Sequence, residues 1–515
     1  MRARIALLLA TAAGSVACTR EPALRFEHIV VVSLDTVRAD RLGCYGHAAA
    51  RTPVLDALAR RGIVFDAATA AAPTTLASHT AVFTGLHPHA HGVARNGFTV
   101  AAENVTLAEL ARASGFRTAA FLGSFALDRR FGLAQGFDTW DQAFDVDVDG
   151  NHEQMQRSAA QVTDAALSWV EREGPERFLL FAHYFDAHAP YEPPPPFDVS
   201  PTRPTAPRSA SLADVDVAVR AQQRRTTGRE LGVQKTIVGG LDAALLDGAD
   251  GQTSPADEDL AALYDGEIAY VDRELGRLLD GLERKGLLRN ALVVVFADHG
   301  ETFAEHADYW NHGLWTYDTT VRVPFLVVAT GPGAEGLAPR RVPDPVSMVD
   351  VLPTVAALAG FAAPEGLDGT SLVDAMRGGT LPRRAVFSEA TQPVRVERPR
   401  TPATPWENAL KAKCVRIGDF KLIRAPYLAR EQLFDVAKDP GERRDLLRAG
   451  VEASELARAP LAELRAALDR FEREARPRPS RFDPSQTLET QAKLRGLGYD
   501  EGANPDDPPP EHTPR

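Results

Sequence analysis

Cysteine is scarce in this sequence, with 3 among 515 residues. A small fold held together by a disulfide framework is therefore excluded, because such folds are dense in cysteine. Apart from Cys18, only Cys44 and Cys414 remain. Two cysteines could form one disulfide in an oxidising compartment, but a core of this size does not need it, and we expect two buried free thiols.

Long apolar runs are also missing, so no membrane-spanning helix is expected. The short apolar stretch from Ile5 to Ala13 follows two arginines, an order that is typical of an export signal. The run Ser15-Val16-Ala17-Cys18 resembles a bacterial lipoprotein processing site, which predicts lipidation of Cys18; cleavage after Ala17 without a lipid is the alternative. Both predict a periplasmic or cell-surface protein, with the lipid as its only membrane anchor.

A basic stripe is absent as well. The net charge is -12, and acids and bases are dispersed along the chain, so nucleic-acid binding is not expected. A hydrophobic fraction of 44% and a charged fraction of 25% are those of a globular enzyme. An acidic protein that handles an anionic substrate needs local positive charge, which a bound divalent cation would supply compactly.

What the sequence does contain is an alternation of buried strands and amphipathic helices. Unbroken apolar runs predict strands at 28–34, 117–122, 178–183, 291–296 and 324–328. Helical spacing of apolar residues predicts helices at 53–61, 106–114, 159–172 and 264–285. This order favours an α/β fold with a doubly wound, mostly parallel sheet flanked by helices.

Composition divides the chain further. We expect a leader over residues 1–25, a catalytic domain over 26–375 with an insertion at about 193–258 that is partly helical around 213–225, a smaller antiparallel α+β subdomain over 376–475, and a polar tail over 476–515. Short strands near 385–387, 413–416 and 420–424 and a helix at 455–474 would form the smaller unit. Leu494 to Tyr499 is the one element of the tail that could dock.

Polar residues follow three of the predicted strands directly. They are Asp35, the pair Asp186 and His188, and the pair Asp298 and His299. In doubly wound sheets the functional groups gather beyond the carboxyl ends of the strands. An aspartate and a histidine offer a hard oxygen and an imidazole nitrogen to a divalent cation, so Asp35, Asp298 and His299 are candidate metal ligands.

Several motifs resemble the sulfatase family of the alkaline-phosphatase superfamily. These are Ser33-Leu34-Asp35-Thr36, Leu42-Gly43-Cys44-Tyr45-Gly46, Thr84-Gly85-x-x-Pro88-x-x-His91-Gly92 and Ala297-Asp298-His299-Gly300-Glu301. The resemblance covers most of residues 26–360 and implies an alkaline-phosphatase-like fold and hydrolysis of sulfate or phosphate esters.

The resemblance also points to a departure at the nucleophile. Many sulfatases carry Cys-x-Pro-Ser-Arg and oxidise the cysteine to formylglycine, but the alignment places Thr75 at the cysteine, Ala77 at the proline and His79 at the arginine. No formylglycine can form from threonine. We therefore expect the Thr75 hydroxyl to attack phosphorus or sulfur directly and to form a covalent intermediate, as in alkaline phosphatases.

Further roles follow from the same resemblance. Asn96 lies where threonine-dependent phosphodiesterases hold a non-bridging oxygen, and His79 would line the substrate pocket. His188 and His312 are candidate proton donors. The sequence leaves the role of Asp186 open, and it assigns structural roles to His87, His89, His91 and His183.

One divalent metal ion, Ca²⁺, Mg²⁺, Mn²⁺ or Zn²⁺, is expected, with Asp35, Thr75, Asp298 and His299 as ligands. The predicted substrate is a small or glycan- or lipid-linked anionic ester, and threonine favours phosphate mono- or diesters. Two alternatives remain at this point: a phosphotransferase that moves a lipid or glycan head group, and a non-catalytic binding protein with the same fold.

Overall fold

The computed structural model describes most of the chain. It covers residues 25–144, 155–211, 214, 217, 255–303, 305–306, 311–391, 411–426, 429–448, 455–475, 478, 481–482, 490 and 493–494. The leader with Cys18, most of the predicted insertion and much of the tail lie outside these residues, so the expectations for them stay predictions. Of the helix expected around 213–225, only residues 214 and 217 are described, and both are helical. Among the described residues, no helix is both long and apolar enough to cross a membrane.

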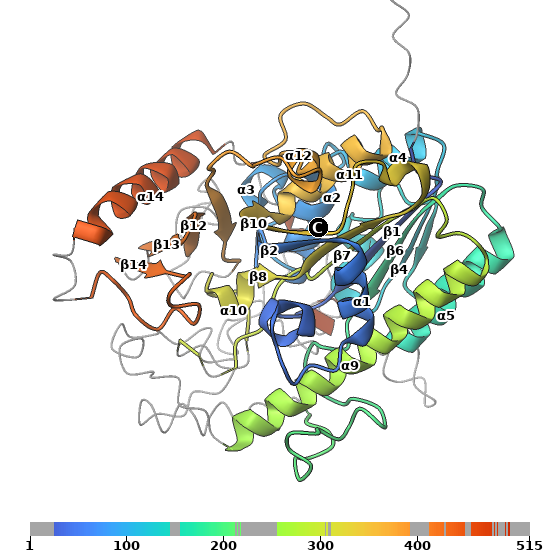
Figure 1. The fold of residues 1–515 in the computed structure, drawn as a ribbon, viewed down its shortest axis with the longest axis horizontal. Helices are drawn as coiled ribbons and strands as arrows, with labels where there is room; N and C mark the ends of the chain where they lie inside the picture. The colour runs from blue at the N-terminus through green and yellow to red at the C-terminus, as the bar shows by residue number, and fades with distance from the viewer. Residues whose placement is uncertain are drawn as a thin grey trace, which may run out of the picture.

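A mixed sheet of nine strands forms the centre of the molecule (Figure 1). Eight of its strands lie in the order β10-β2-β9-β7-β1-β6-β4-β5, and β8 pairs with β2. Their bounds are β1 His28–Leu34, β2 Ile63–Thr69, β4 Arg117–Phe121, β5 Thr139–Asp141, β6 Phe178–Tyr184, β7 Ala291–Phe296, β8 Arg322–Val323, β9 Phe325–Ala329 and β10 Arg340–Ser347. The strands β1, β4, β5, β6 and β7 run parallel, as does β10 beside β2, which confirms the mostly parallel sheet.

Helices cover both faces of this sheet (Figure 1). On one face lie α1 Pro53–Arg61, α5 Ala159–Glu173 and α9 Pro255–Arg284; on the other lie α2 Thr75–Thr84, α3 Pro88–His91, α4 Leu107–Ala113, α11 Val351–Ala359 and α12 Val373–Met376. The short α10, Asp318–Val321, precedes β8. The helices expected at 53–61, 106–114, 159–172 and 264–285 are all present, although α9 begins nine residues earlier than its apolar spacing indicated.

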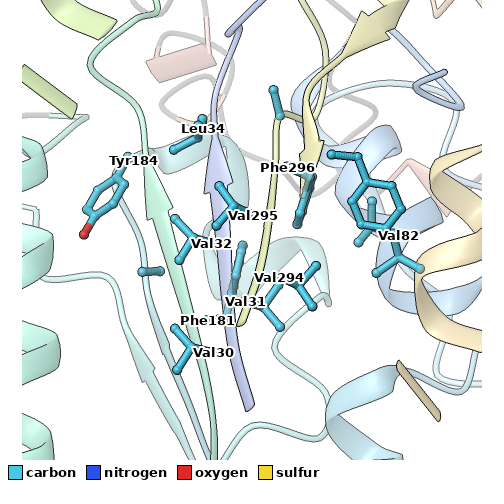
Figure 2. Packing of buried hydrophobic residues seen from close by; sticks show 14 of the residues in the cluster. Val30, Val31, Val32, Leu34, Val82, Phe181, Tyr184, Val294, Val295 and Phe296 are labelled. Carbon is cyan, nitrogen blue, oxygen red and sulfur yellow. The ribbon is translucent and has the colours of Figure 1, made fainter. Parts of the chain in front are cut away.

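The central strands are buried because both of their faces carry apolar side chains. All seven residues of β1 and all six of β7 are buried. Figure 2 shows how side chains from β1, β6, β7 and α2 pack against one another, with Val31, Phe181 and Phe296 among them. Burial of each such side chain contributes about 1.5–3 kcal/mol, so this core fixes the positions at which the strands end.

A separate antiparallel sheet of four strands lies to one side of the large sheet (Figure 1). It contains β11 Val386–Glu389, β12 Lys413–Ile417, β13 Phe420–Ala425 and β14 Arg430–Asp435, and α14, Glu455–Glu474, packs on β12 and β13. This matches the antiparallel α+β unit that was expected, and the exact domain boundaries stay predictions. A two-stranded pair joins β15, Arg481–Phe482, to β3, Phe98–Thr99.

The two remaining cysteines are free thiols, as expected. Cys414 is buried, and burial raises the pKa of its thiol to about 11. Cys44 is only partly buried, so the expectation of a buried thiol holds for Cys414 alone.

Candidate active site

The ends of β1 and β7 bring two aspartates to the same edge of the sheet. The two strands are adjacent and parallel, with Ser33 paired to Phe296 near their carboxyl ends. Asp35 follows β1 directly, and Asp298 follows β7 after one alanine. Because parallel strands present their carboxyl ends at one edge, the two side chains meet there.

Asp35, Asp298 and His299 form a fully buried group. Each offers a ligand atom, and these atoms lie within 4.8 Å of one another. The Nε2 atom of His299 is 3.4 Å from the Asp298 carboxylate and 4.0 Å from the Asp35 carboxylate. The structure therefore brings together three of the four predicted metal ligands.

In each of the three side chains, one polar atom is hydrogen-bonded to the protein, and the other has no hydrogen-bond partner among the described residues. The Nδ1–H of His299 donates to the Gly300 carbonyl at 2.9 Å, and Oδ1 of Asp298 accepts from the amide of Thr36 at 3.2 Å. Oδ2 of Asp35 accepts from Nε2 of His183 at 2.8 Å. Within the described residues, Asp35 Oδ1, Asp298 Oδ2 and His299 Nε2 have no hydrogen-bond partner.

These three leftover atoms fit a divalent cation. Buried polar atoms without a partner are costly, and two carboxylate oxygens with one imidazole nitrogen are a donor set that such cations accept. The hydrogen bonds to the opposite side of each ligand orient it, as outer partners do in metal sites. The residues present therefore match the cofactor that the sequence predicted.

Burial shifts the titration of the same groups. It raises the pKa of Asp35 to about 8 and raises the pKa of Asp298 well above its usual range, where the neighbouring Asp35 adds to the shift. It lowers the pKa of His299 well below its usual value. Burial thus favours the uncharged forms, and a positive charge between the carboxylates would reverse that preference.

Thr75 is the first residue of α2 and is fully buried. A hydrogen bond from its hydroxyl lowers the pKa of Asp35 and so places that hydroxyl beside the metal-ligand group. Ser78, one turn later, donates its hydroxyl to the Asp298 carbonyl at 2.6 Å and ties α2 to the same edge. The positive end of the helix dipole also lies at Thr75, which favours a negatively charged group there.

Asn96 lies next to Thr75 through the backbone of Leu76. Its Oδ1 accepts from the Leu76 amide at 2.8 Å, which fixes the side-chain orientation. Its Nδ2 is buried without a hydrogen-bond partner among the described residues. A donor left over in this way is available to an oxygen of a bound substrate.

His312 lies next to the metal ligand His299, and His188 lies next to His312. The His312 ring is stacked obliquely on His299 with centroids 4.4 Å apart, and His188 contacts His312 edge-on at 5.2 Å. Burial lowers the pKa of both rings. At His312, however, the Glu301 carboxylate 3.4 Å from Nδ1, together with Asp35 and Asp298, outweighs this effect and raises the pKa, whereas the pKa of His188 falls to about 3.

His79 lies within the site, but it is fully buried inside the fold. Its Nδ1 is 2.7 Å from the Thr75 carbonyl, and its Nε2 is 2.8 Å from the Ser33 hydroxyl. Both ring nitrogens are thus bonded to protein groups. The predicted substrate contact of His79 stays a prediction, and either nitrogen would have to give up one of these bonds to make it.

Sequence reasoning missed His183. The amide of Gly123 donates to its Nδ1 at 3.4 Å, so its Nε2–H donates to Asp35. The residue lies inside the apolar run of β6, where the sequence predicts a structural role. Its pairing with Ser33 of β1, two residues before Asp35, would have revealed it, but only once the strand order was known.

Known proteins resemble this chain over most of its length. The family model described as Sulfatase matches residues 27–361. An N-acetylglucosamine-6-O-sulfatase of Bacteroides thetaiotaomicron is 24% identical over 85% of this chain and 86% of its own, and an arylsulfatase of Clostridium perfringens is 22% identical over 67% and 78%.

Solved structures show the same fold. The crystal structure of the phosphonate monoester hydrolase of Agrobacterium radiobacter superimposes with a TM-score of 0.62 at 24% identity. The match covers 85% of this chain and 95% of that one.

Proposed function

This chain is an ester hydrolase that belongs to the sulfatase family, and from that premise we propose that it cleaves sulfate or phosphate esters through a covalent intermediate on Thr75. The observation that carries the proposal is the convergence of three buried ligand atoms at the sheet edge, where Thr75, the buried first residue of α2, lies beside Asp35. A buried hydroxyl at a helix N-terminus next to such a group is well placed to act as a nucleophile.

Asp35, Asp298, His299 and the Thr75 hydroxyl would hold one divalent cation, Ca²⁺, Mg²⁺, Mn²⁺ or Zn²⁺. When bound, the cation supplies positive charge that lowers the pKa of the hydroxyl and of nearby donors. The protein residues do the rest. Asp35, held by His183, keeps the hydroxyl oriented, and α2 carries Thr75 as its first residue.

Once its proton has been lost to solvent, the Thr75 oxygen attacks and forms a bond to sulfur or phosphorus while the bond to the ester oxygen breaks. The Nδ2–H of Asn96 donates to a non-bridging oxygen as negative charge develops there. His312, whose protonated form is favoured by Glu301, gives a proton to the departing oxygen, and water then releases sulfate or phosphate from Thr75. His188, the other candidate proton donor, contacts the ring of His312.

The names of the relatives bear on the substrate class. They include a sulfatase that acts on a sugar sulfate and a hydrolase of phosphonate monoesters. We propose an anionic ester, free or carried by a glycan or lipid, and threonine in place of cysteine favours the phosphate esters because no formylglycine can form.

We also propose that the protein is exported and carries a lipid on Cys18, which metabolic labelling with a fatty acid would detect in wild type and not in Cys18→Ser.

A panel assay tests the proposed function. Nitrophenyl sulfate, phosphate monoester and phosphodiester are offered to the purified protein, with and without a chelator, beside Thr75→Ala and Thr75→Ser. The proposal expects turnover of at least one ester that is lost with the chelator and restored by one of the four cations. Activity that survives exhaustive chelation would contradict the metal, and equal turnover by Thr75→Ala would contradict the nucleophile.

A further inference from the structure

A C-terminal segment, described at residues 478, 481–482, 490 and 493–494, contacts the loop that carries Asn96. The backbone amide of Arg478 donates to the His89 carbonyl at 2.9 Å. Three and four residues later, β15 pairs with β3, with Arg481 opposite Thr99 and Phe482 opposite Phe98. A segment more than 370 residues downstream in the sequence therefore contacts both sides of Asn96.

The first contact reaches His91 through Asn104. A guanidinium N–H of Arg478 donates to Oδ1 of Asn104, and Nδ2 of Asn104 donates to the His91 carbonyl at 2.8 Å. Since Oδ1 accepts from arginine, the amide of Asn104 is held in the orientation that bonds His91. Arg478 thus restrains the end of α3, where the loop begins.

The second contact restrains the other end of the same loop. Between the last residue of α3, His91, and the first of β3, Phe98, no regular element intervenes. The pairing of β3 with β15 fixes the chain just after Asn96. Both ends of a short irregular loop are consequently tied to one C-terminal segment.

Further contacts hold the C-terminal segment against the catalytic part. The Arg130 guanidinium donates to the Thr490 hydroxyl at 2.8 Å, and the Lys493 ammonium lies 5.4 Å from the centroid of the Phe125 ring. Leu494 is 1% exposed and belongs to the main core. The segment is therefore anchored on the large domain at positions beyond its contacts with the loop.

We propose that Arg478 and β15 position Asn96, so that the C-terminal segment sets the geometry of the donor to the transition state. The inference rests on the proposed function, because it takes Asn96 as that donor. Arg478 is a positioning residue that acts through Asn104 and the loop. A shift of the loop would leave substrate binding elsewhere in the site intact and would weaken the one hydrogen bond that grows in the transition state.

A double-mutant cycle tests the proposal, with Arg478→Ala, Asn96→Ala, the double variant, and Arg473→Ala as a matched exposed arginine on α14. We expect Arg478→Ala to lower kcat about 10-fold with little change in KM, as a small misplacement does. Added to Asn96→Ala it should lower kcat no further. An equal loss in both backgrounds, or a kcat like that of Arg473→Ala, would overturn the proposal.

Hydrogen exchange provides a readout that does not depend on activity. Peptides covering residues 91–104 should exchange faster in Arg478→Ala than in wild type, and peptides from the central strands should not. Unchanged exchange in residues 91–104 would overturn the positioning role whatever the kinetics. Wild-type kcat in Asn96→Ala, with faster loop exchange in Arg478→Ala, would instead show that the proposed role of Asn96 in hydrolysis has failed.

Discussion

At the scale of single residues, the site depends on which polar atom of each ligand side chain is hydrogen-bonded to the protein. Asp35, Asp298 and His299 each have one polar atom bonded to the protein and one left over. Because the bonded atoms fix each side chain, the three atoms without a partner point at one another. The sequence predicts which residues are ligands, but it does not predict which of their atoms bond to the protein, because those partners come from distant strands.

His183 is the residue whose removal tests this arrangement. Replacing it by alanine should weaken binding of the divalent cation about 10–100-fold, because the Asp35 carboxylate loses the bond that orients it. Calorimetric titration of chelator-stripped protein measures the change. Glutamine at the same position retains an N–H donor and should recover part of the affinity.

His28 serves as the control for His183. It is also a buried histidine on the central sheet, but it stacks on Phe178 at the opposite end of β1. His28→Phe should leave cation affinity unchanged. Equal weakening in both variants would mean that the effect comes from loosening of the sheet and not from Asp35.

At the scale of elements, the turn after β7 is the most constrained part of the site. A Cβ on Gly300 would lie 2.1 Å from the Thr319 carbonyl oxygen, a contact that only a backbone shift can relieve. We expect Gly300→Ala to lower the free energy of unfolding by about 1–3 kcal/mol and to weaken cation binding, because the shift moves His299. Urea denaturation and cation titration measure the two effects.

Gly441 provides the matched control for that turn. A Cβ added to Gly441 would lie 3.5 Å from its nearest neighbour, the side chain of Arg443, which is an ordinary contact. Gly441→Ala should unfold like the wild type and bind the cation equally well. Wild-type stability in Gly300→Ala would contradict the constraint.

The elements also show what periodicity could and could not predict. The strands β1 and β7 and the helices α1 and α14 have the expected bounds, because their apolar patterns are unbroken. The strand β2 was missed, since Asp66 interrupts its run, and α2 was missed because all ten of its residues are buried and no polar face marks it as a helix. The strand β9 was expected, but no pattern predicts that it runs antiparallel.

At the scale of the whole molecule, a buried ion pair between Lys421 and Asp318 joins the C-terminal sheet to the large domain. The Lys421 ammonium on β13 is 1% exposed and lies 2.6 Å from Asp318 and 2.8 Å from Glu442. Lys421→Met should lower the free energy of unfolding by about 3–5 kcal/mol, because it leaves buried carboxylates uncompensated. Denaturation curves measure the loss.

Lys438 is the control for that pair. It also bonds a carboxylate, Asp435, but its side chain is 80% exposed. Lys438→Met should change the free energy of unfolding by about 0–1 kcal/mol, as exposed pairs do. Similar losses in the two variants would contradict the structural role assigned to Lys421.

A second junction predicts a dependence on pH. Nδ1 of His89 on α3 is 2.6 Å from the Glu389 carboxylate on β11. Burial opposes both charges, but the mutual attraction wins: it raises the pKa of His89 above 6.5, and with nearby lysines it lowers the pKa of Glu389 below 4.5.

The sign of the effect follows from these directions. The histidine contributes its stability fully below 6.5 and loses it as pH rises through the raised pKa, and the glutamate contributes above 4.5 and loses it as pH falls. The difference in free energy of unfolding between wild type and His89→Gln should therefore be largest between pH 4.5 and 6.5 and smaller at alkaline pH. Denaturation at a series of pH values checks this, and a difference that grows with pH would contradict it.

The central claim is that the Thr75 oxygen becomes covalently bound to the transferred group. Its most direct test is acid quenching of the enzyme during turnover, followed by mass spectrometry of the peptide that contains Thr75. The account predicts a sulfo or phospho group on Thr75 in wild type, lost in Thr75→Ala, while the neighbouring Thr74 stays unmodified. An active wild-type enzyme that shows modification at another residue, or at none under conditions where hydrolysis of the covalent intermediate is rate-limiting, would contradict it.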